Sequence, residues 1–190
     1  MTRKGQSRMS DPISALNGAA FQGFASVREI GPLGMISLRA KDVPGLAAAI
    51  KAAVGTPVPD RRRIEASGGF ACGWMSPDEY LLILPYGQVS QAMTAIATAL
   101  VGQHHLAVDV SDARAVFRIE GDKAGQVLAK LSPTDLSAMA PHELRRSRVA
   151  QVAAAFWAQD GGYTLICFRS VAGYVMALLA HSAQTGSELG

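Results

Sequence analysis

Matching residues that recur about eighty positions apart constrain this 190-residue chain more than any other feature. Five pairs keep a nearly constant spacing, 83 residues for the first three and 81 for the last two: Trp74 and Trp157, Tyr80 and Tyr163, Met93 and Met176, Leu38 and Ile119, Ile50 and Leu131. A fixed period is the signature of an internal repeat. The sequence therefore predicts two halves of similar structure, with two extra residues in the second half after Leu136.

The first half has the pattern strand, helix, strand, strand, helix, strand, which is the ferredoxin-like order. Apolar residues at helical spacing define the helices, and Ser76–Glu79 predicts the turn of a hairpin because proline suits the second turn position. Asp42 is predicted to cap the first helix. The predicted elements are residues 33–39, 42–54, 70–75, 80–84, 87–100 and 106–110.

The second half repeats this order but has no sixth strand. Its predicted elements are residues 115–120, 123–131, 149–157 and 163–168, then a helix after Ser170, with Asp122 and Ser170 as predicted helix caps. An open sheet edge invites another strand, so either residues 25–30 fill it or a partner covers it. The predicted fold class is α+β, with two fused ferredoxin-like βαββα(β) halves.

The domain organisation follows from this pattern. We expect a disordered basic tail over residues 1–21, a single domain over 22–183 made of two pseudo-repeats (about 31–110 and 113–183), and a flexible C-terminus over 184–190. The net charge of +3 equals the contribution of Arg3, Lys4 and Arg8 in the tail, so the rest is neutral and does not favour nucleic-acid binding.

Composition predicts where the protein is located, and it allows three interpretations of the low content of charged residues. No long apolar run follows the basic start, so we expect neither a signal peptide nor a membrane span. Cys72 and Cys167 lie in predicted strands, which suits buried, reduced thiols in a cytoplasmic protein. Charged residues make up 17% of the chain, below the typical ~25%. This indicates a large core, a surface covered by a partner, or simply an alanine-rich composition.

One cluster of polar residues, Asp109, Ser111, Asp112 and Arg114, lies where the halves join. These residues either line a pocket or fix a turn, because Asp and Ser accept backbone hydrogen bonds at chain reversals, and we favour the turn. The basic runs 61–63 and 145–148 are expected to be solvated loops, with contact to an acidic partner as the alternative. His104 and His105 have no further ligands at metal-binding spacing. No catalytic residue, cofactor-binding motif or metal site is predicted.

The order Asp-Val-Ser-Asp-x-Arg, apolar strand, Glu-Gly-Asp, helix, Leu-Ser-Pro-Thr-Asp-Leu over residues 109–136 resembles the folate-binding fold of the glycine-cleavage T-protein. Within that group it is most similar to the gamma-subunit family of heterotetrameric sarcosine oxidase. The runs 73–82, 146–157 and 168–174 agree with that family in order and spacing, and the resemblance covers about residues 31–183.

The resemblance implies a non-catalytic gamma subunit that supports assembly of a complex oxidising sarcosine to glycine. It implies alpha, beta and delta partner subunits that carry FAD, FMN, NAD and zinc, with tetrahydrofolate as co-substrate. It implies no cofactor in this chain, and self-association when the chain is isolated. One alternative is a stand-alone folate-binding protein of the aminomethyltransferase type, with its pocket at Asp109, Ser111, Asp112 and Arg114. A second is the iron–sulfur maintenance branch, whose Lys-Gly-Cys stretch is absent here.

Overall fold

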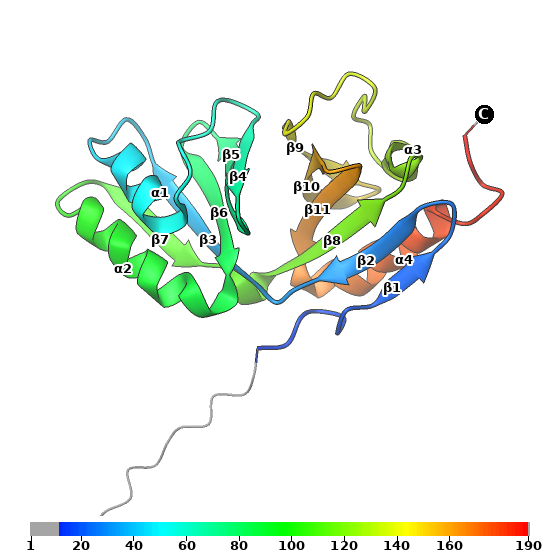
Figure 1. The fold of residues 1–190 in the computed structure, drawn as a ribbon, viewed down its shortest axis with the longest axis horizontal. Coiled ribbons are helices and arrows are strands. Elements are labelled where there is room, and N and C mark those ends of the chain that lie inside the picture. Colours follow the sequence, from blue (N-terminus) through cyan, green and yellow to red (C-terminus); the bar gives the residue numbers. More distant parts are fainter. Residues whose placement is uncertain (1–11, 190) are drawn as a thin grey trace, which may run out of the picture.

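The computed structural model describes residues 12–189, which form two antiparallel sheets flanked by helices (Figure 1). The five-stranded sheet has the order β4 (Ile64–Ser67), β5 (Phe70–Ser76), β6 (Glu79–Pro85), β3 (Leu33–Ala40), β7 (His105–Asp109). The six-stranded sheet has the order β1 (Ala20–Gln22), β2 (Ser26–Ile30), β8 (Arg114–Glu120), β11 (Gly162–Phe168), β10 (Val152–Gln159), β9 (Leu144–Val149). The helices are α1 (Leu46–Val54), α2 (Val89–Ala99), α3 (Ala124–Ala129) and α4 (Ala172–Ser182).

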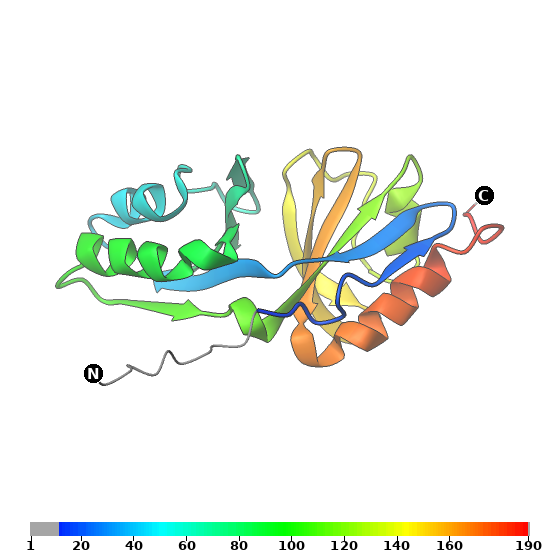
Figure 2. The same cartoon turned by 60° about the horizontal axis from the view of Figure 1, so that its bottom comes forward.

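The sheets face each other and the helices lie on the two outer sides (Figures 1 and 2). One apolar cluster joins α1 and α2 to the five-stranded sheet, and a second joins α3 and α4 to the six-stranded sheet. A third cluster fills the space between the sheets, with these fully or nearly buried members: Met35, Ile64, Ala71, Leu81, Ile83, Val116, Leu144, Ala155, Trp157 and Ile166. The chain therefore folds as one packed unit of four layers.

Strand β6 shows why the sequence produces this arrangement. Tyr80, Leu82 and Leu84 point to the helices, whereas Leu81 and Ile83 point to the opposite sheet. Successive side chains of a strand alternate between its two faces. A continuous apolar run is thus the expected pattern for a strand that is buried on both faces.

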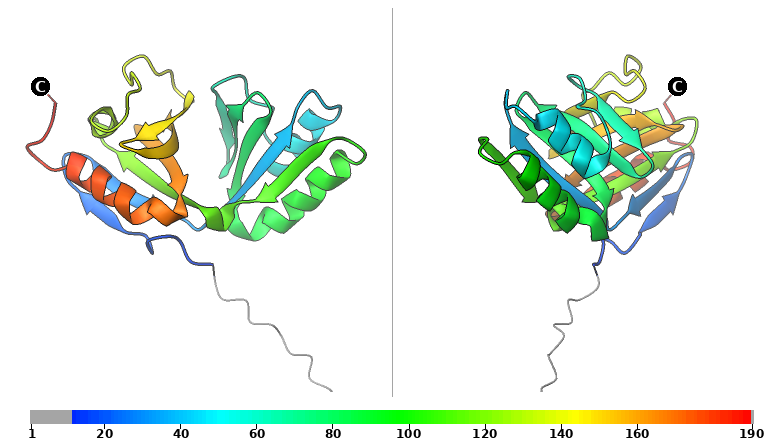
Figure 3. Two further views of the ribbon diagram at one scale, coloured as in Figure 1. Left: turned by 180° about the vertical axis from the view of Figure 1, so that it is seen from behind. Right: turned by 60° about the vertical axis from the view of Figure 1, so that its left-hand side comes forward.

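The two sheets also connect through the edge strands β4 and β9. The amide of Leu144 donates to the carbonyl of Arg62 (2.8 Å), and the amide of Ile64 donates to the carbonyl of His142 (3.0 Å). Gly73 permits the close packing, because a Cβ there would lie 2.7 Å from Cδ1 of Leu144. The rear and side views show β4 and β5 next to β9 and β10 (Figure 3).

The hairpin of β9 and β10 corrects the sequence interpretation. The run 145–148, expected as a solvated loop, lies in β9, where residues alternate between inward and exposed positions. The strand predicted over residues 149–157 corresponds to β10, which begins at Val152 and forms a hairpin with the unpredicted β9, and the chain reverses at Ala150 with φ of 50°. The alternation of Arg with small residues hid the first strand of this hairpin, because it lacks the apolar run typical of buried strands.

The structure decides how the six-stranded sheet is completed. Strand β2 pairs with β8 in antiparallel register from Ser26↔Glu120 to Ile30↔Val116, so the first of the two sequence alternatives is confirmed. The predicted open edge is therefore filled by the chain itself. Strand β1 then forms the outer edge of this sheet.

Three predicted helix caps are wrong. Helix α1 begins at Leu46 after Gly45 in the left-handed region, and Asp42 lies before it with φ of 52°. Helix α3 begins at Ala124 without a side-chain cap from Asp122, and α4 begins at Ala172, after a short 3-10 turn that includes Ser170. In each case at least one further residue separates the predicted cap from the first helical residue. The side chain of the predicted cap therefore does not bond the free backbone amides of the first helical turn.

The predicted equivalence of Trp74 and Trp157 in the two halves is also wrong. Trp74 packs against the helix-facing cluster of the five-stranded sheet, whereas Trp157 is buried in the cluster between the sheets. Trp74 lies opposite Tyr80, but Trp157 lies opposite Thr164. A register irregularity between Trp74 and Ser76 moves the first hairpin out of step with the second. The other four pairs pack on the helix side in both halves.

Both ends of the described chain make specific contacts. The expected basic tail extends to residue 21, of which residues 1–11 lie outside the described range; β1, however, already begins at Ala20, so order starts before residue 22. The buried carboxylate of Glu29 accepts from Ser14 Oγ (2.8 Å) and the amides of Leu16 (3.1 Å) and Gly18 (2.9 Å).

The C-terminal residues expected to be flexible are likewise in contact with the domain. Lys130 Nζ donates to the carbonyls of Ser182 (2.8 Å) and Ser187, and the amide of Leu189 donates to Gln126 Oε1 (2.9 Å). Composition could not show these contacts, because their partners lie more than fifty residues earlier in the chain.

We predict that Glu29→Ala lowers the free energy of unfolding by about 2–4 kcal/mol, since it leaves several donors near a buried site unpaired. Glu29→Gln, which keeps one acceptor oxygen, is expected to cost less. Urea unfolding measures both variants, and limited proteolysis should cut Glu29→Ala within residues 12–19. Equal stability of Glu29→Ala and the parent chain would show that this carboxylate does not anchor the segment.

Candidate functional site

The predicted cluster at the junction separates into two parts with different roles. Ser111 is buried, and its Oγ accepts from the amide of Met35 (2.9 Å) and donates to Asp109 Oδ1 (2.5 Å). Asp109 Oδ1 also accepts from the amide of Ser111 (2.9 Å). These bonds hold the short 3-10 turn (Ser111–Ala113) between the halves, as the favoured interpretation expects.

The other two members point to different surroundings. Asp112 is exposed and accepts from the Tyr86 hydroxyl (3.2 Å). Partial desolvation raises the pKa of that phenol, and the hydrogen bond to Asp112 raises it further. Arg114 lies on the inner face of β8, and its guanidinium sits 4.3 Å from the centre of the Phe168 ring. The four residues therefore do not form one pocket.

Arg114 lines a cavity of about 250 Å³ that lies between the sheets beside the apolar cluster. Its apolar wall comes from both sheets, with Met75 and Leu81 on one side and Ala153–Ala155 and Ile166 on the other. Its charged groups are Arg114, Arg146 and Glu79. Large apolar area with a few convergent polar groups is typical of ligand sites.

Most of the charge in this cavity is already compensated. Glu79 accepts from Ser37 Oγ (3.3 Å) and from Arg146 Nη1 (3.4 Å), and Arg146 also donates to the carbonyl of Met75 (3.2 Å). Burial lowers the pKa of Arg114, an effect that Glu79 opposes and Arg146 reinforces. The arginine nevertheless stays protonated near neutral pH, because guanidinium deprotonates only in strong base.

Sequence reasoning found Arg114 but missed Glu79, Arg146 and Phe168 as its neighbours. Glu79 was interpreted only as a turn residue and Arg146 as part of a basic loop. The available signal was the alternation in residues 144–149, which places Arg146 and Leu144 on one face of a strand. Phe168 lies opposite Arg114 across the β8–β11 pair, a register that the sequence alone does not show.

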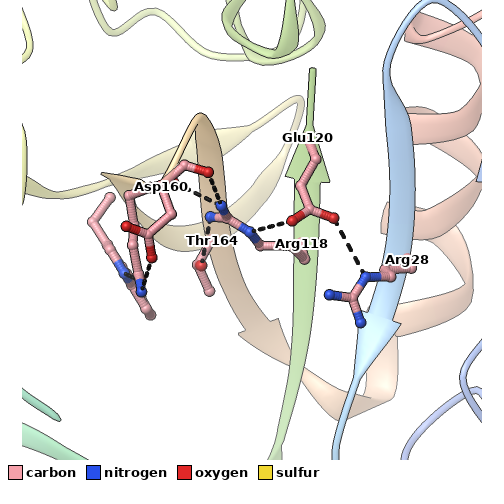
Figure 4. A network of polar contacts seen from close by, with 7 residues as sticks. Arg28, Arg118, Glu120, Asp160 and Thr164 are labelled. Carbon is pink, nitrogen blue, oxygen red and sulfur yellow. Dashed lines mark hydrogen bonds and ion pairs between the residues drawn. The ribbon is translucent and has the colours of Figure 1, made fainter. Parts of the chain in front are cut away.

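A second polar network lies on the same inner face, around Arg118 (Figure 4). Arg118 is only 7% exposed, and its Nη2 donates to the carbonyls of Gln159 (2.7 Å) and Asp160 (2.8 Å). Its Nε pairs with Glu120 Oε1 (3.2 Å), and Glu120 Oε2 meets Arg28 at 3.5 Å. The hydrogen bonds from Arg118 to the carbonyls of Gln159 and Asp160 tie the β10–β11 turn to β8, so this network stabilises the turn.

The described residues offer little for catalysis. In residues 12–189 no group of three His, Cys, Asp or Glu side chains could hold a metal ion. Ser147, which borders the cavity, is bonded to Ser132 (3.3 Å) and Thr134 (3.1 Å) and has no neighbouring base among these contacts. No helix in the described part of the chain has the length and apolar character needed to cross a bilayer.

Comparison with known proteins gives a consistent result. The model of the sarcosine oxidase, gamma subunit family matches residues 39–184. A sarcosine oxidase subunit gamma from Arthrobacter sp is 37% identical over 118 residues, which covers 60% of this chain and 56% of the relative. The same-named protein from Corynebacterium sp. (strain P-1) is 34% identical over 116 residues with equal coverage. The chain thus spans just over half the length of these curated relatives.

Two solved structures share the fold. Heterotetrameric sarcosine oxidase from Corynebacterium sp. U-96, in complex with pyrrole 2-carboxylate, contains a chain with a TM-score of 0.77 and 23% identity, covering 86% of this chain and 87% of that one. The glycine cleavage system aminomethyltransferase T from Bartonella henselae has a TM-score of 0.63 and 10% identity, and the match covers 86% of this chain and 47% of that one. The mixed α+β fold with two antiparallel sheets is thereby confirmed as similar to both.

We predict that Arg118→Met destabilises the protein by about 2–4 kcal/mol, because two partly buried carbonyls and Glu120 lose the charged donor of a buried arginine. Arg28→Met removes an exposed pair and should cost less than about 1 kcal/mol. Urea unfolding of the two variants gives the comparison. Similar losses for both would contradict the assigned difference between them.

We also predict that neither cysteine reacts with a thiol reagent in the folded protein at pH 8. Burial raises the pKa of Cys72 to about 12 and that of Cys167 to about 11, and both are free. Only thiolate reacts, so labelling should need unfolding. Since the unfolded thiols ionise from about pH 9, stability should fall as pH rises beyond that value. Rapid labelling of native protein would rule out this burial.

Proposed function

The chain belongs to the sarcosine oxidase gamma subunit family, and from this premise we propose that it is a non-catalytic subunit of a heterotetrameric sarcosine oxidase. In this role it supports assembly of a complex that oxidatively demethylates sarcosine to glycine. The observation that carries the proposal is the family match over residues 39–184, which includes most of both sheets.

The proposed complex contains larger partner subunits, alpha and beta, and a small delta subunit. We propose that FAD, FMN and NAD bind to the large subunits, zinc to the delta subunit, and that tetrahydrofolate accepts the one-carbon unit. This chain holds none of these cofactors in the proposal. We further propose a cytoplasmic location.

The alternative of a stand-alone folate-binding transferase is not favoured. Both curated relatives are named sarcosine oxidase subunit gamma, whereas the likeness to the T-protein rests on the fold at 10% identity. A fold shared at this level does not carry an activity with it. In addition, Asp109 is committed to the junction turn through Ser111.

We also propose that the two halves, about residues 31–110 and 113–183 within a single domain, are related by an internal repeat. The orders β4-β5-β6-β3-β7 and β9-β10-β11-β8-β2 correspond strand by strand, with β2 standing where β7 does. Four of the five matched pairs support the proposal. The two tryptophans do not, since they lie on different sheet faces.

An exposed edge strand is the surface that best suits association with a larger subunit. Among residues 12–189, strand β7 pairs only with β3, and its Leu106 and Val108 are 55% and 41% exposed. An edge with free backbone groups and apolar side chains can accept a strand from another chain. The earlier expectation of an open edge in the other sheet no longer contributes, because β2 fills that edge.

We predict that the chain co-purifies with the products of its neighbouring genes as one complex. Co-expression with an affinity tag on another subunit, followed by size-exclusion chromatography, is the measurement. Leu106→Lys should reduce recovery of the complex at least several-fold, since it places a charge in the proposed contact. Tyr174→Lys, at a comparably exposed site on α4, is the matched control.

The outcomes separate two levels of the proposal. If the other subunits assemble while the parent chain elutes alone near 19.9 kDa, the assembly role is wrong. If the complex forms equally well with Leu106→Lys, the assignment of the contact to β7 is wrong and the assembly role stands.

A further inference from the structure

The cavity between the sheets contains a cation that the fold leaves without a counter-ion. Of its three charged groups, Glu79 and Arg146 pair with each other. Within residues 12–189 no carboxylate forms an ion pair with Arg114, and its pKa responds to burial and to charges at a distance. The cavity wall thus carries an excess of one positive charge.

The placement of Arg114 restricts what could neutralise it. The guanidinium of Arg114 lies over the Phe168 ring, 4.3 Å from its centre, and both residues line the cavity. A planar guanidinium presents paired donors that match the two oxygens of a carboxylate. A carboxylate can therefore bind here with both oxygens.

The remaining walls restrict the size and polarity of the ligand. Leu81, Ile166 and Ala155 offer an apolar surface next to Arg114, and the volume is about 250 Å³. At roughly 30 Å³ for each water in the liquid, this space holds a molecule of only a few heavy atoms besides the carboxylate. Glu79 further disfavours ligands with two negative charges.

We propose that the cavity between the two sheets binds a small monocarboxylate through the Arg114 guanidinium, with its apolar part against Leu81 and Ile166. The inference does not depend on the proposed assembly role. A carboxylate of this kind has two sources, a free small molecule or an acidic side chain of a partner. We commit to the free molecule, because the lining residues of the described chain already form a cavity of about 250 Å³ without a partner.

The test is a titration of the ¹⁵N-labelled full chain with acetate, propionate and butyrate, followed by NMR at constant ionic strength. We expect saturable shifts at the amides of Ala153–Ala155 and Phe168 and at Arg114 Nε, with affinity increasing from acetate to butyrate. Propionamide and chloride should produce no saturable shifts at these groups, since neither offers a charged pair of oxygens.

Variants give the decisive comparison. Arg114→Gln should weaken propionate binding about 10- to 100-fold, the factor that corresponds to loss of a charge-assisted hydrogen bond. Arg39→Gln, which removes an exposed arginine paired with Asp78, should leave binding within about twofold. Glu79→Gln should strengthen binding several-fold, because it removes a repulsive charge. Glu79→Gln keeps the test informative if Arg114→Gln folds poorly.

Three results would overturn the proposal. Chloride could produce the same shifts as propionate, which indicates a non-specific anion effect. Arg114→Gln could bind propionate as well as the parent chain does. Finally, all carboxylates could fail to bind while Arg114→Gln abolishes co-purification with the other subunits, which would assign the cavity to an acidic side chain of a partner.

Discussion

Apolar contact between the two sheets is the constraint on which the rest of this structure depends. Each sheet already uses one face to pack against its helices, so the inner faces must be covered by one another. Burial of apolar area is the main favourable term in folding, at about 25 cal/mol for each Å². Leu144, Trp157 and Ile166 therefore contribute to holding the halves together as well as to the order within their own sheet.

The same contact explains where the polar groups lie. Charged residues on the inner faces cannot reach bulk water freely, and an unpaired buried charge is costly. Arg118 meets this requirement with backbone carbonyls and Glu120. Arg146 is half-exposed and pairs with Glu79. Arg114 lies over the Phe168 ring, and among the described residues it forms no ion pair, although Glu79 and Arg146 line the same cavity. The three arginines of the inner face thus differ in how far their charges are paired within the fold.

Sequence reasoning recovered the elements with strong local signals and missed those defined by distant partners. The apolar run of β6 and the helical spacing in α2 were sufficient, and the structure has both elements close to their predicted bounds. Strands β4 and β9 lack such runs; each pairs with the next strand of its own half and also contacts the other half. Arg114 was found because it stands at a junction, whereas Glu79 and Phe168 become its neighbours only through folding.

The completion of the six-stranded sheet by β2 has a consequence for synthesis of the chain. On the ribosome β2 emerges first, yet its partner β8 follows about ninety residues later, so the pairing closes a long loop. The five-stranded sheet needs only residues 33–109 and can form while the remainder is still being made. The backbone contact between Phe24 and Ala183 (2.9 Å) brings the start of β2 close to the end of α4. A circular permutant with residues 12–32 moved behind α4 would make all pairing in the second sheet local to its own half.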